Sequence, residues 1–90
     1  MRKITQEICR AFNQNVAHKI GNSSTTGTAL FLHGNLIAEK RDGRLWITTA
    51  GWPSNTTKER LNGLYGVNIF QKKGIWYLNE KEWSGEWIAI

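Results

Sequence analysis

Glycine-containing dipeptides separate short apolar runs along this 90-residue chain, and they constrain its fold more than any other feature. Asp42-Gly43 is the strongest short signal for a two-residue β-hairpin turn, and Gly34-Asn35 and Lys73-Gly74 stand between similar runs. Lys73 is nevertheless a poor residue for the positive φ that such a turn requires. The runs predict strands over residues 28–33, 36–41, 44–49, 67–72 and 75–79, with a last short strand over 87–90.

Two helices are predicted around the first three strands. Near the start of the chain, apolar residues recur every four positions, at Ile4, Ile8, Phe12 and Val16. This spacing predicts an amphipathic helix over residues 4–18, and the small polar residues 21–28 then predict a mobile loop. Thr56 and Glu59 form a capping box that predicts a second helix after Pro53. The order α-β-β-β-α-β-β-(β) predicts an α+β fold, a single domain over residues 1–90 with an antiparallel sheet and two helices packed on it.

Two-residue turns would also fix which side chains share a face of the sheet. One face would hold a core of Ala29, Phe31, Leu36, Ala38, Leu45 and Ile47. The opposite face would hold an exposed apolar patch of Leu30, Leu32, Ile37 and Trp46. The apolar surface on these two faces is larger than the area that two short helices can cover. We therefore expect a symmetric homodimer, with Trp46 or the Trp83–Trp87 segment near its interface.

The composition offers no support for an enzyme. The chain has one Cys, two His and one Asp, and the single Asp42 is better explained as a turn residue. A zinc site needs about four ligands at suitable spacing, and no phosphate-binding loop or dinucleotide motif is present. We expect no catalytic residue, no metal and no cofactor. The lone Cys9 suits a reducing cytosol, and no apolar run is long enough to span a membrane.

The charge distribution suggests an anionic partner. Twelve Lys and Arg against seven Asp and Glu give a net charge of +5. Lys58 and Arg60 fall in the first turn of the second predicted helix, where cations oppose the helix dipole, so their presence favours binding of an anion. A solvated helix start compensated by Glu59 is the alternative. The candidate phosphate-binding residues are Thr57, Lys58, Arg60, Arg41, Arg44, Lys72 and Lys73.

Aromatic residues accompany the cations. A turn at Lys73-Gly74 would pair Phe70 with Tyr77 on the same face as Lys72, an arrangement that suits stacking on single-stranded bases. Packing of Phe70 and Tyr77 beneath the first helix is the favoured alternative. Trp46 has the same two interpretations, whereas Trp83 and Trp87 are spaced to close the core or a dimer interface.

The order helix, three strands, helix over residues 4–65 is similar in shape to double-stranded RNA-binding domains, which also place basic residues at the start of the second helix. Lys58 and Arg60 match that position. The family's Lys-Lys-x-Ala-Lys run is absent here, and the C-terminal hairpin is an addition, so the similarity concerns topology alone.

A closer resemblance lies in four stretches of the sequence. They are Leu32-His33-Gly34-Asn35-Leu36-Ile37-Ala38, residues 50–64, residues 71–79, and Glu82-Trp83-Ser84-Gly85-Glu86-Trp87. These stretches resemble a family of small, largely uncharacterised proteins encoded by tailed bacteriophages. The resemblance covers most of residues 30–88 and implies a setting in the cytoplasm of an infected bacterium. Small basic phage proteins often serve counter-defence, by occupying a host toxin or nuclease.

The leading hypothesis is therefore a non-enzymatic, RNA-binding phage accessory protein that neutralises a host defence factor, such as a toxin ribonuclease. A first alternative is an inhibitor that binds a host protein directly through the exposed patch of Leu30, Leu32, Ile37 and Trp46. A second alternative is a small structural or virion protein. Binding to nucleic acid should weaken steeply with salt, whereas an apolar protein interface should not.

Overall fold

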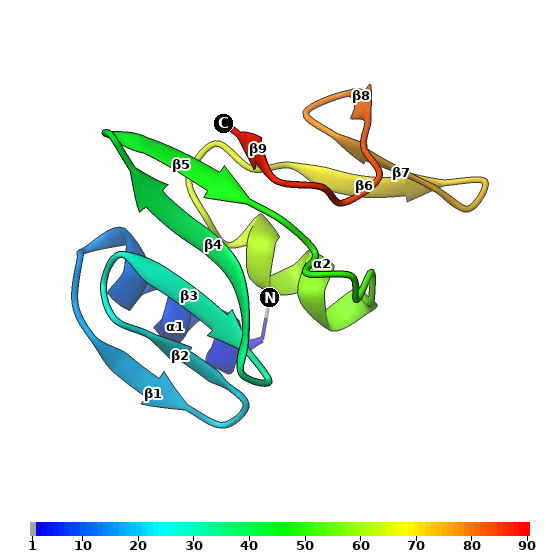
Figure 1. Ribbon diagram of the computed structural model, residues 1–90. Helices are drawn as coiled ribbons and strands as arrows, with labels where there is room; N and C mark the ends of the chain where they lie inside the picture. The colour runs from blue at the N-terminus through cyan, green and yellow to red at the C-terminus, as the bar shows by residue number, and fades with distance from the viewer. Residues whose placement is uncertain (1) are drawn as a thin grey trace.

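Two antiparallel sheets organise the computed structural model, which describes residues 2–90 (Figure 1). The larger sheet has the order β1-β2-β3-β4-β5-β9, formed by His18–Ile20, Ser23–Thr25, Ala29–Leu32, Asn35–Arg41, Arg44–Ile47 and Ile88–Ala89. The smaller sheet joins β6 (Ile69–Lys72), β7 (Ile75–Leu78) and β8 (Lys81–Glu82). The helices are α1 (Lys3–Asn13) and α2 (Asn55–Asn62). The predicted α+β class is confirmed.

The first helix ends earlier than its apolar spacing predicts. Asn15 adopts a left-handed backbone with φ of 59°. Its N–H donates to the Phe12 carbonyl at 3.1 Å, and the Val16 N–H donates to the Ala11 carbonyl at 2.8 Å. These two bonds form the Schellman motif that terminates helices. Val16 is consequently exposed rather than part of the buried stripe. Neither helix is long and apolar enough to cross a membrane.

The segment predicted as a mobile loop contains a strand instead. Strands β1 and β2 pair around Gly21 and Asn22, and β2 pairs with β3. Short hydroxyl side chains stabilise this region because they satisfy backbone groups locally. Thr25 Oγ1 donates to the Ala29 carbonyl at 2.6 Å and accepts from the Gly27 N–H at 2.9 Å. With these two added strands, the chain order differs from that of double-stranded RNA-binding domains.

The β3–β4 hairpin turns one residue earlier than predicted. His33 and Gly34 occupy the turn with φ of 52° and 79°, and Leu32 pairs with Asn35. A bulge follows, because Phe31 pairs with Leu36 but Leu30 pairs with Ala38. A one-residue shift moves side chains to the other face of a sheet. Leu30 and Leu32 are therefore buried in the core, where the sequence pattern placed Ala29 and Phe31.

The other two predicted turns are confirmed. Asp42 and Gly43 have φ of 50° and 77°, which sets Arg41 opposite Arg44 and Glu39 opposite Trp46. Lys73 and Gly74 have φ of 53° and 80°, which sets Phe70 opposite Tyr77. Lys73 accepts positive φ in spite of its side chain. The predicted last strand is also present as β9 on the edge beside β5.

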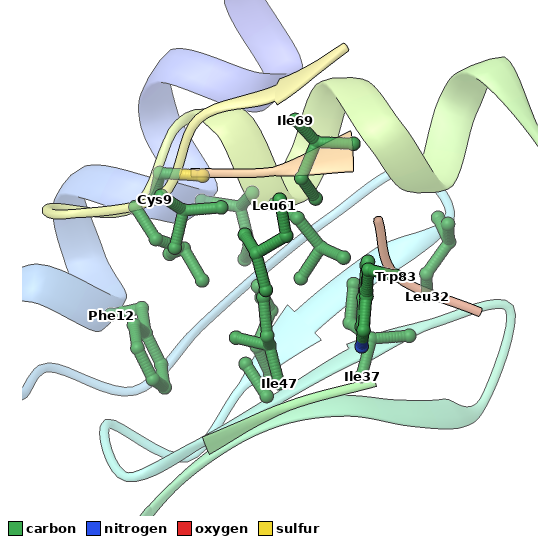
Figure 2. Close-up of a cluster of buried hydrophobic side chains, with 14 residues drawn as sticks. Cys9, Phe12, Leu32, Ile37, Ile47, Leu61, Ile69 and Trp83 are labelled. Carbon is green, nitrogen blue, oxygen red and sulfur yellow. The ribbon is translucent and has the colours of Figure 1, made fainter. Parts of the chain in front are cut away.

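The core lies between the larger sheet and the helices (Figure 2). Helix α1 covers β1 and β2, and α2 contacts β4 and β6, so α2 joins the two sheets. Buried members of the core include Cys9, Phe12, Leu32, Ile37, Ile47, Leu61, Ile69 and Trp83. The two helices approach closely at Gly63, where an added Cβ would lie 2.5 Å from Cys9 Sγ.

Candidate nucleic-acid interface

Hairpin β6–β7 carries two cations at its tip. It extends away from the larger sheet in Figure 1. Lys72 and Lys73 are both exposed, and Lys73 is the first residue of the turn itself. Asn and Asp are the usual non-glycine residues at such a position, because their side chains tolerate a left-handed backbone. The structure therefore places an ammonium group at the tip at some cost in local backbone energy.

An aromatic pair lies behind this tip. The rings of Phe70 and Tyr77 are stacked, with centroids 5.2 Å apart and planes 12° apart. Phe70 is 38% exposed, so the pair does not lie beneath the first helix, and the packing alternative favoured by the sequence is wrong. Cross-strand pairing puts Lys72 and Ile75 on the same face of the sheet as this pair. Two cations and an exposed aromatic surface thus occur on one hairpin.

Helix α2 brings a third cation to the opposite face of the hairpin, because Trp76 pairs with Gln71 and this pair alternates with that of Phe70 and Tyr77. Lys58 Nζ lies 5.7 Å from the centroid of the Trp76 ring. Within residues 2–90, neither Lys58 nor the two tip lysines have a carboxylate within 4.0 Å. All three cations are free to meet an anion. We call the set of Lys58, Phe70, Lys72, Lys73 and Tyr77 the hairpin surface.

The start of α2 differs from the predicted anion site. Ser54 is the N-cap, with its Oγ accepting from the Thr57 N–H at 3.1 Å, so Thr56 is not the cap. Thr57 is buried, and its Oγ1 donates to the Trp52 carbonyl at 2.9 Å. The Thr57 groups expected to bind phosphate are therefore already used within the protein.

Arg60 is fully buried and cannot contact nucleic acid. Its guanidinium donates from Nη1 to Thr5 Oγ1 at 2.5 Å and to Glu59 Oε1 at 2.9 Å. It also donates from Nε to Ser23 Oγ at 3.0 Å and from Nη2 to Asn22 Oδ1 at 3.3 Å. Arg60 thus joins α2 to α1 and β2, and its predicted role as a phosphate ligand is wrong.

Helical spacing contained the signal for this burial. Thr57, Leu61 and Leu64 follow each other at intervals of four and three residues, and Arg60 is one turn before Leu64. These four positions share one helix face. Because Leu61 and Leu64 face inward, Thr57 and Arg60 had to face inward as well. The partners of Arg60 come from distant segments, so the sequence could not identify them.

Arg41 and Arg44 lie at the tip of β4–β5, at the opposite end of the molecule from the tip of β6–β7 (Figure 1). Arg41 Nε pairs with Glu39 Oε1 at 2.7 Å. Its guanidinium carbon lies 5.2 Å from the Trp46 ring centroid and 4.6 Å from that of Trp87. We call Glu39, Arg41, Trp46 and Trp87 the Arg41 cluster. The predicted phosphate-binding residues therefore do not form one continuous surface.

Lys40 is half-buried and binds the end of α1 rather than extending this tip. Its ammonium donates to the Phe12 carbonyl at 2.5 Å, to Asn15 Oδ1 at 2.6 Å and to the Gly27 carbonyl at 3.1 Å. Desolvation by burial lowers its pKa from the ordinary value. Lys40 thereby stabilises the C-terminal end of α1, where carbonyl groups lack helical partners.

The predicted apolar interface is largely interior. Leu30, Leu32 and Ile37 are buried core residues, so they form no exposed patch. The displaced turn and the bulge account for this error. Trp83 is 3% exposed and closes the core, whereas Trp46 is half-buried and Trp87 is 38% exposed. Only these last two remain accessible for an interface.

The architecture and its exposed groups define a small antiparallel α+β protein with a basic, aromatic hairpin. Residues 1–89 match a family model described as Kyanoviridae Gp96 protein, and the chain therefore belongs to this family of phage proteins. The predicted membership of a phage protein family is confirmed. Comparison with curated proteins found no match, and comparison with solved structures found none.

Proposed function

We propose that this phage protein is a non-enzymatic binder of single-stranded RNA that uses the hairpin surface. The observation that carries the proposal is the exposed Phe70–Tyr77 stack beside two unpaired lysines. Proteins that bind single strands combine cations for the backbone with aromatic rings on which bases stack. Each stacked base contributes about 1–3 kcal/mol. Lys58, on the neighbouring helix, adds a cation on the opposite face of the hairpin.

In the infected bacterium, the proposed use of this binding is to neutralise a host defence factor, such as a toxin ribonuclease, with RNA bridging the two. The support is the phage family and the net charge of +5. Affinity purification from infected cells, with both protein and RNA identified, tests this use. Recovery of one host nuclease together with RNA would support the bridge. Recovery of the nuclease after RNA has been digested would contradict it.

A double substitution tests RNA binding at the hairpin surface. Lys72→Ala with Lys73→Ala removes two phosphate contacts. The slope of log Kd against the logarithm of the salt concentration should therefore decrease by about one to two units. Lys3→Ala with Lys19→Ala is the matched control. It changes the net charge equally, at exposed sites on α1 and β1. Fluorescence anisotropy with labelled oligouridine at 50 and 200 mM salt provides the measurement. Equal slopes for both double variants would contradict the proposed site.

The Arg41 cluster supports a second candidate function, direct binding to a host protein. Trp and Arg are enriched among the residues that dominate protein interfaces. Here Arg41 lies between two indole rings, and Glu39 fixes its orientation. Binding through this cluster would depend weakly on salt. Trp87→Ala would weaken it without changing affinity for RNA.

A further inference from the structure

A cavity on the face of hairpin β6–β7 that carries Gln71 and Trp76, opposite the Phe70–Tyr77 pair, has the lining of a nucleobase pocket. Its volume is about 620 Å³, and its wall includes Pro53, Gln71, Trp76, Trp83 and Glu86. Trp76 contributes an indole ring that is partly accessible. Lys58 Nζ lies over that ring, beside the cavity. The wall also carries the carboxylates of Glu82 and Glu86, which can accept from the N–H groups of a base, while Lys58 outside the cavity can meet the phosphate attached to that base.

The wall formed by residues 83–86 is held rigidly. The carbonyl of Gly85 accepts from Thr48 Oγ1 at 2.7 Å and from the Thr49 N–H at 3.0 Å. Gly85 has φ of 95°, and a Cβ there would lie 2.4 Å from Thr49 Oγ1, so this close approach requires glycine. The Trp83 indole N–H donates to the Glu86 carbonyl at 2.9 Å and closes the turn. Such a wall needs little ordering when a ligand binds.

The polar groups of the wall determine which base fits. Glu86 is exposed, and the hydroxyl of Ser84 donates to its carboxylate. This hydrogen bond lowers the pKa of Glu86, so the group is ionised and can only accept. The amide of Gln71 can donate. Guanine presents one acceptor, O6, next to two donors, N1–H and N2–H₂, along its Watson–Crick edge. Uracil presents a single donor between two acceptors.

We infer that this cavity binds a guanine base of a single-stranded RNA, stacked on Trp76, with Glu86 accepting from its Watson–Crick edge and Gln71 donating to O6. The inference rests on the proposed function, because Lys58 and the tip lysines would hold the adjoining phosphates. It adds base selectivity to a surface whose cations and stacked rings bind any sequence. Removal of the acceptor at residue 86 should therefore change selectivity and leave the salt dependence intact.

The test compares nine-residue oligouridine with the same strand carrying one central guanosine, inosine or 7-deazaguanosine. The parent protein should bind the guanosine strand about tenfold more tightly than oligouridine. Inosine lacks the N2 amino group and should lose most of this preference. By contrast, 7-deazaguanosine keeps the Watson–Crick edge and should retain it. These ligand changes leave the protein unaltered, so they do not depend on the folding of a variant.

Glu86→Gln provides the protein-side test, because glutamine keeps an oxygen for Ser84 while replacing one acceptor by a donor. Guanosine preference should fall to about twofold or less. Glu80→Gln is the matched control, since Glu80 is exposed and does not line the cavity, and it should keep the preference. Equal binding of guanosine and uridine strands by the parent, or an unchanged preference in Glu86→Gln, would overturn the inference while leaving RNA binding in place. Failure to bind any of the strands would overturn both.

Discussion

At the scale of single residues, Arg60 determines how the two helices and the larger sheet fit together. A buried cation is costly unless its donors are satisfied and its charge is paired. Arg60 meets both conditions through Glu59, Thr5, Ser23 and Asn22. Within residues 2–90, no buried side-chain polar atom lacks a hydrogen-bond partner. One of the residues predicted to bind phosphate is therefore a structural residue.

Arg60→Ala should lower the free energy of unfolding by about 3 kcal/mol, because it leaves polar partners unsatisfied and opens a cavity. Arg60→Lys should also be strongly destabilising, since an ammonium cannot reach partners on three elements from one position. Lys58→Ala should change stability by less than about 0.5 kcal/mol. Urea denaturation measures all three. An Arg60→Ala protein as stable as Lys58→Ala would contradict the role assigned to the network.

The same network should make folding sensitive to acid. Hydrogen bonding from Thr5, together with the charges of Arg2 and Arg60, lowers the pKa of Glu59 below its ordinary value of 4.5. A carboxylate with a lowered folded-state pKa contributes stability above pH 4.5 that disappears as the pH falls through the folded value. Between about pH 5 and 3, the Tm of the parent should therefore fall more steeply than that of Glu59→Gln. Parallel Tm profiles would rule out this contribution.

At the scale of elements, turn chemistry was the most predictable part of the fold. Two of three predicted hairpin turns occur at the predicted residues; one sets Glu39 opposite Trp46, and the other gives the predicted pairing of Phe70 with Tyr77. The third turn was misplaced by one residue, because His33-Gly34 forms it in place of Gly34-Asn35. That shift was enough to exchange core and surface along β3.

Other element boundaries depended on signals that are weak in sequence. Apolar spacing favoured continuing α1 to Val16, but Asn15 ends it with a left-handed backbone. Serine and threonine favoured a loop over residues 21–28, yet their hydroxyls satisfy the backbone of a short strand. For the candidate site, the turn at Lys73-Gly74 and the pairing of Phe70 with Tyr77 were predicted correctly, but the favoured packing of that pair beneath the first helix was wrong. The separation of Arg41 and Arg44 from that tip followed only from the arrangement of the two sheets.

The turn of hairpin β6–β7 gives a prediction that separates stability from binding. Lys73→Asn places a residue favoured at positive φ in the first turn position, so stability should rise by about 0.5 kcal/mol. The same change removes one phosphate contact, so the slope of log Kd for RNA against the logarithm of the salt concentration should decrease by about 0.7. Thermal melts and anisotropy on the same preparation provide both values. A variant that gains stability and keeps the parental salt dependence would show that Lys73 does not contact RNA.

At the scale of the whole molecule, the surface available for a homodimer differs from the one that the sequence predicts. The core covers the patch of Leu30, Leu32 and Ile37, so excess apolar surface no longer supports the dimer. Strand β9 is an edge of the larger sheet, and exposed Trp87 precedes it directly. Edge strands present unpaired backbone groups that can join a second copy. A symmetric dimer through β9 and Trp87 is therefore the proposal that remains.

Light scattering at micromolar concentration should give twice the monomer mass of 10.3 kDa. Trp87→Ala should halve the observed mass, because it removes the aromatic contact beside the edge strand. Tyr65→Ala is a suitable control, since Tyr65 is an exposed aromatic residue that follows α2 and lies outside the Arg41 cluster. A parent protein that runs as a monomer would leave the Arg41 cluster free for a different protein.

In the proposed function, the hairpin surface binds single-stranded RNA and the Arg41 cluster does not. The most direct measurement is an NMR titration of the labelled protein with a short guanosine-containing oligoribonucleotide, because it locates the contact without any substitution. We expect the largest chemical-shift changes at Lys58, Phe70, Lys72, Lys73 and Tyr77. The chemical shifts of Arg41, Trp46 and Trp87 should not change. Changes confined to Arg41, Trp46 and Trp87, or no changes at any ratio of RNA to protein, would contradict the proposed function.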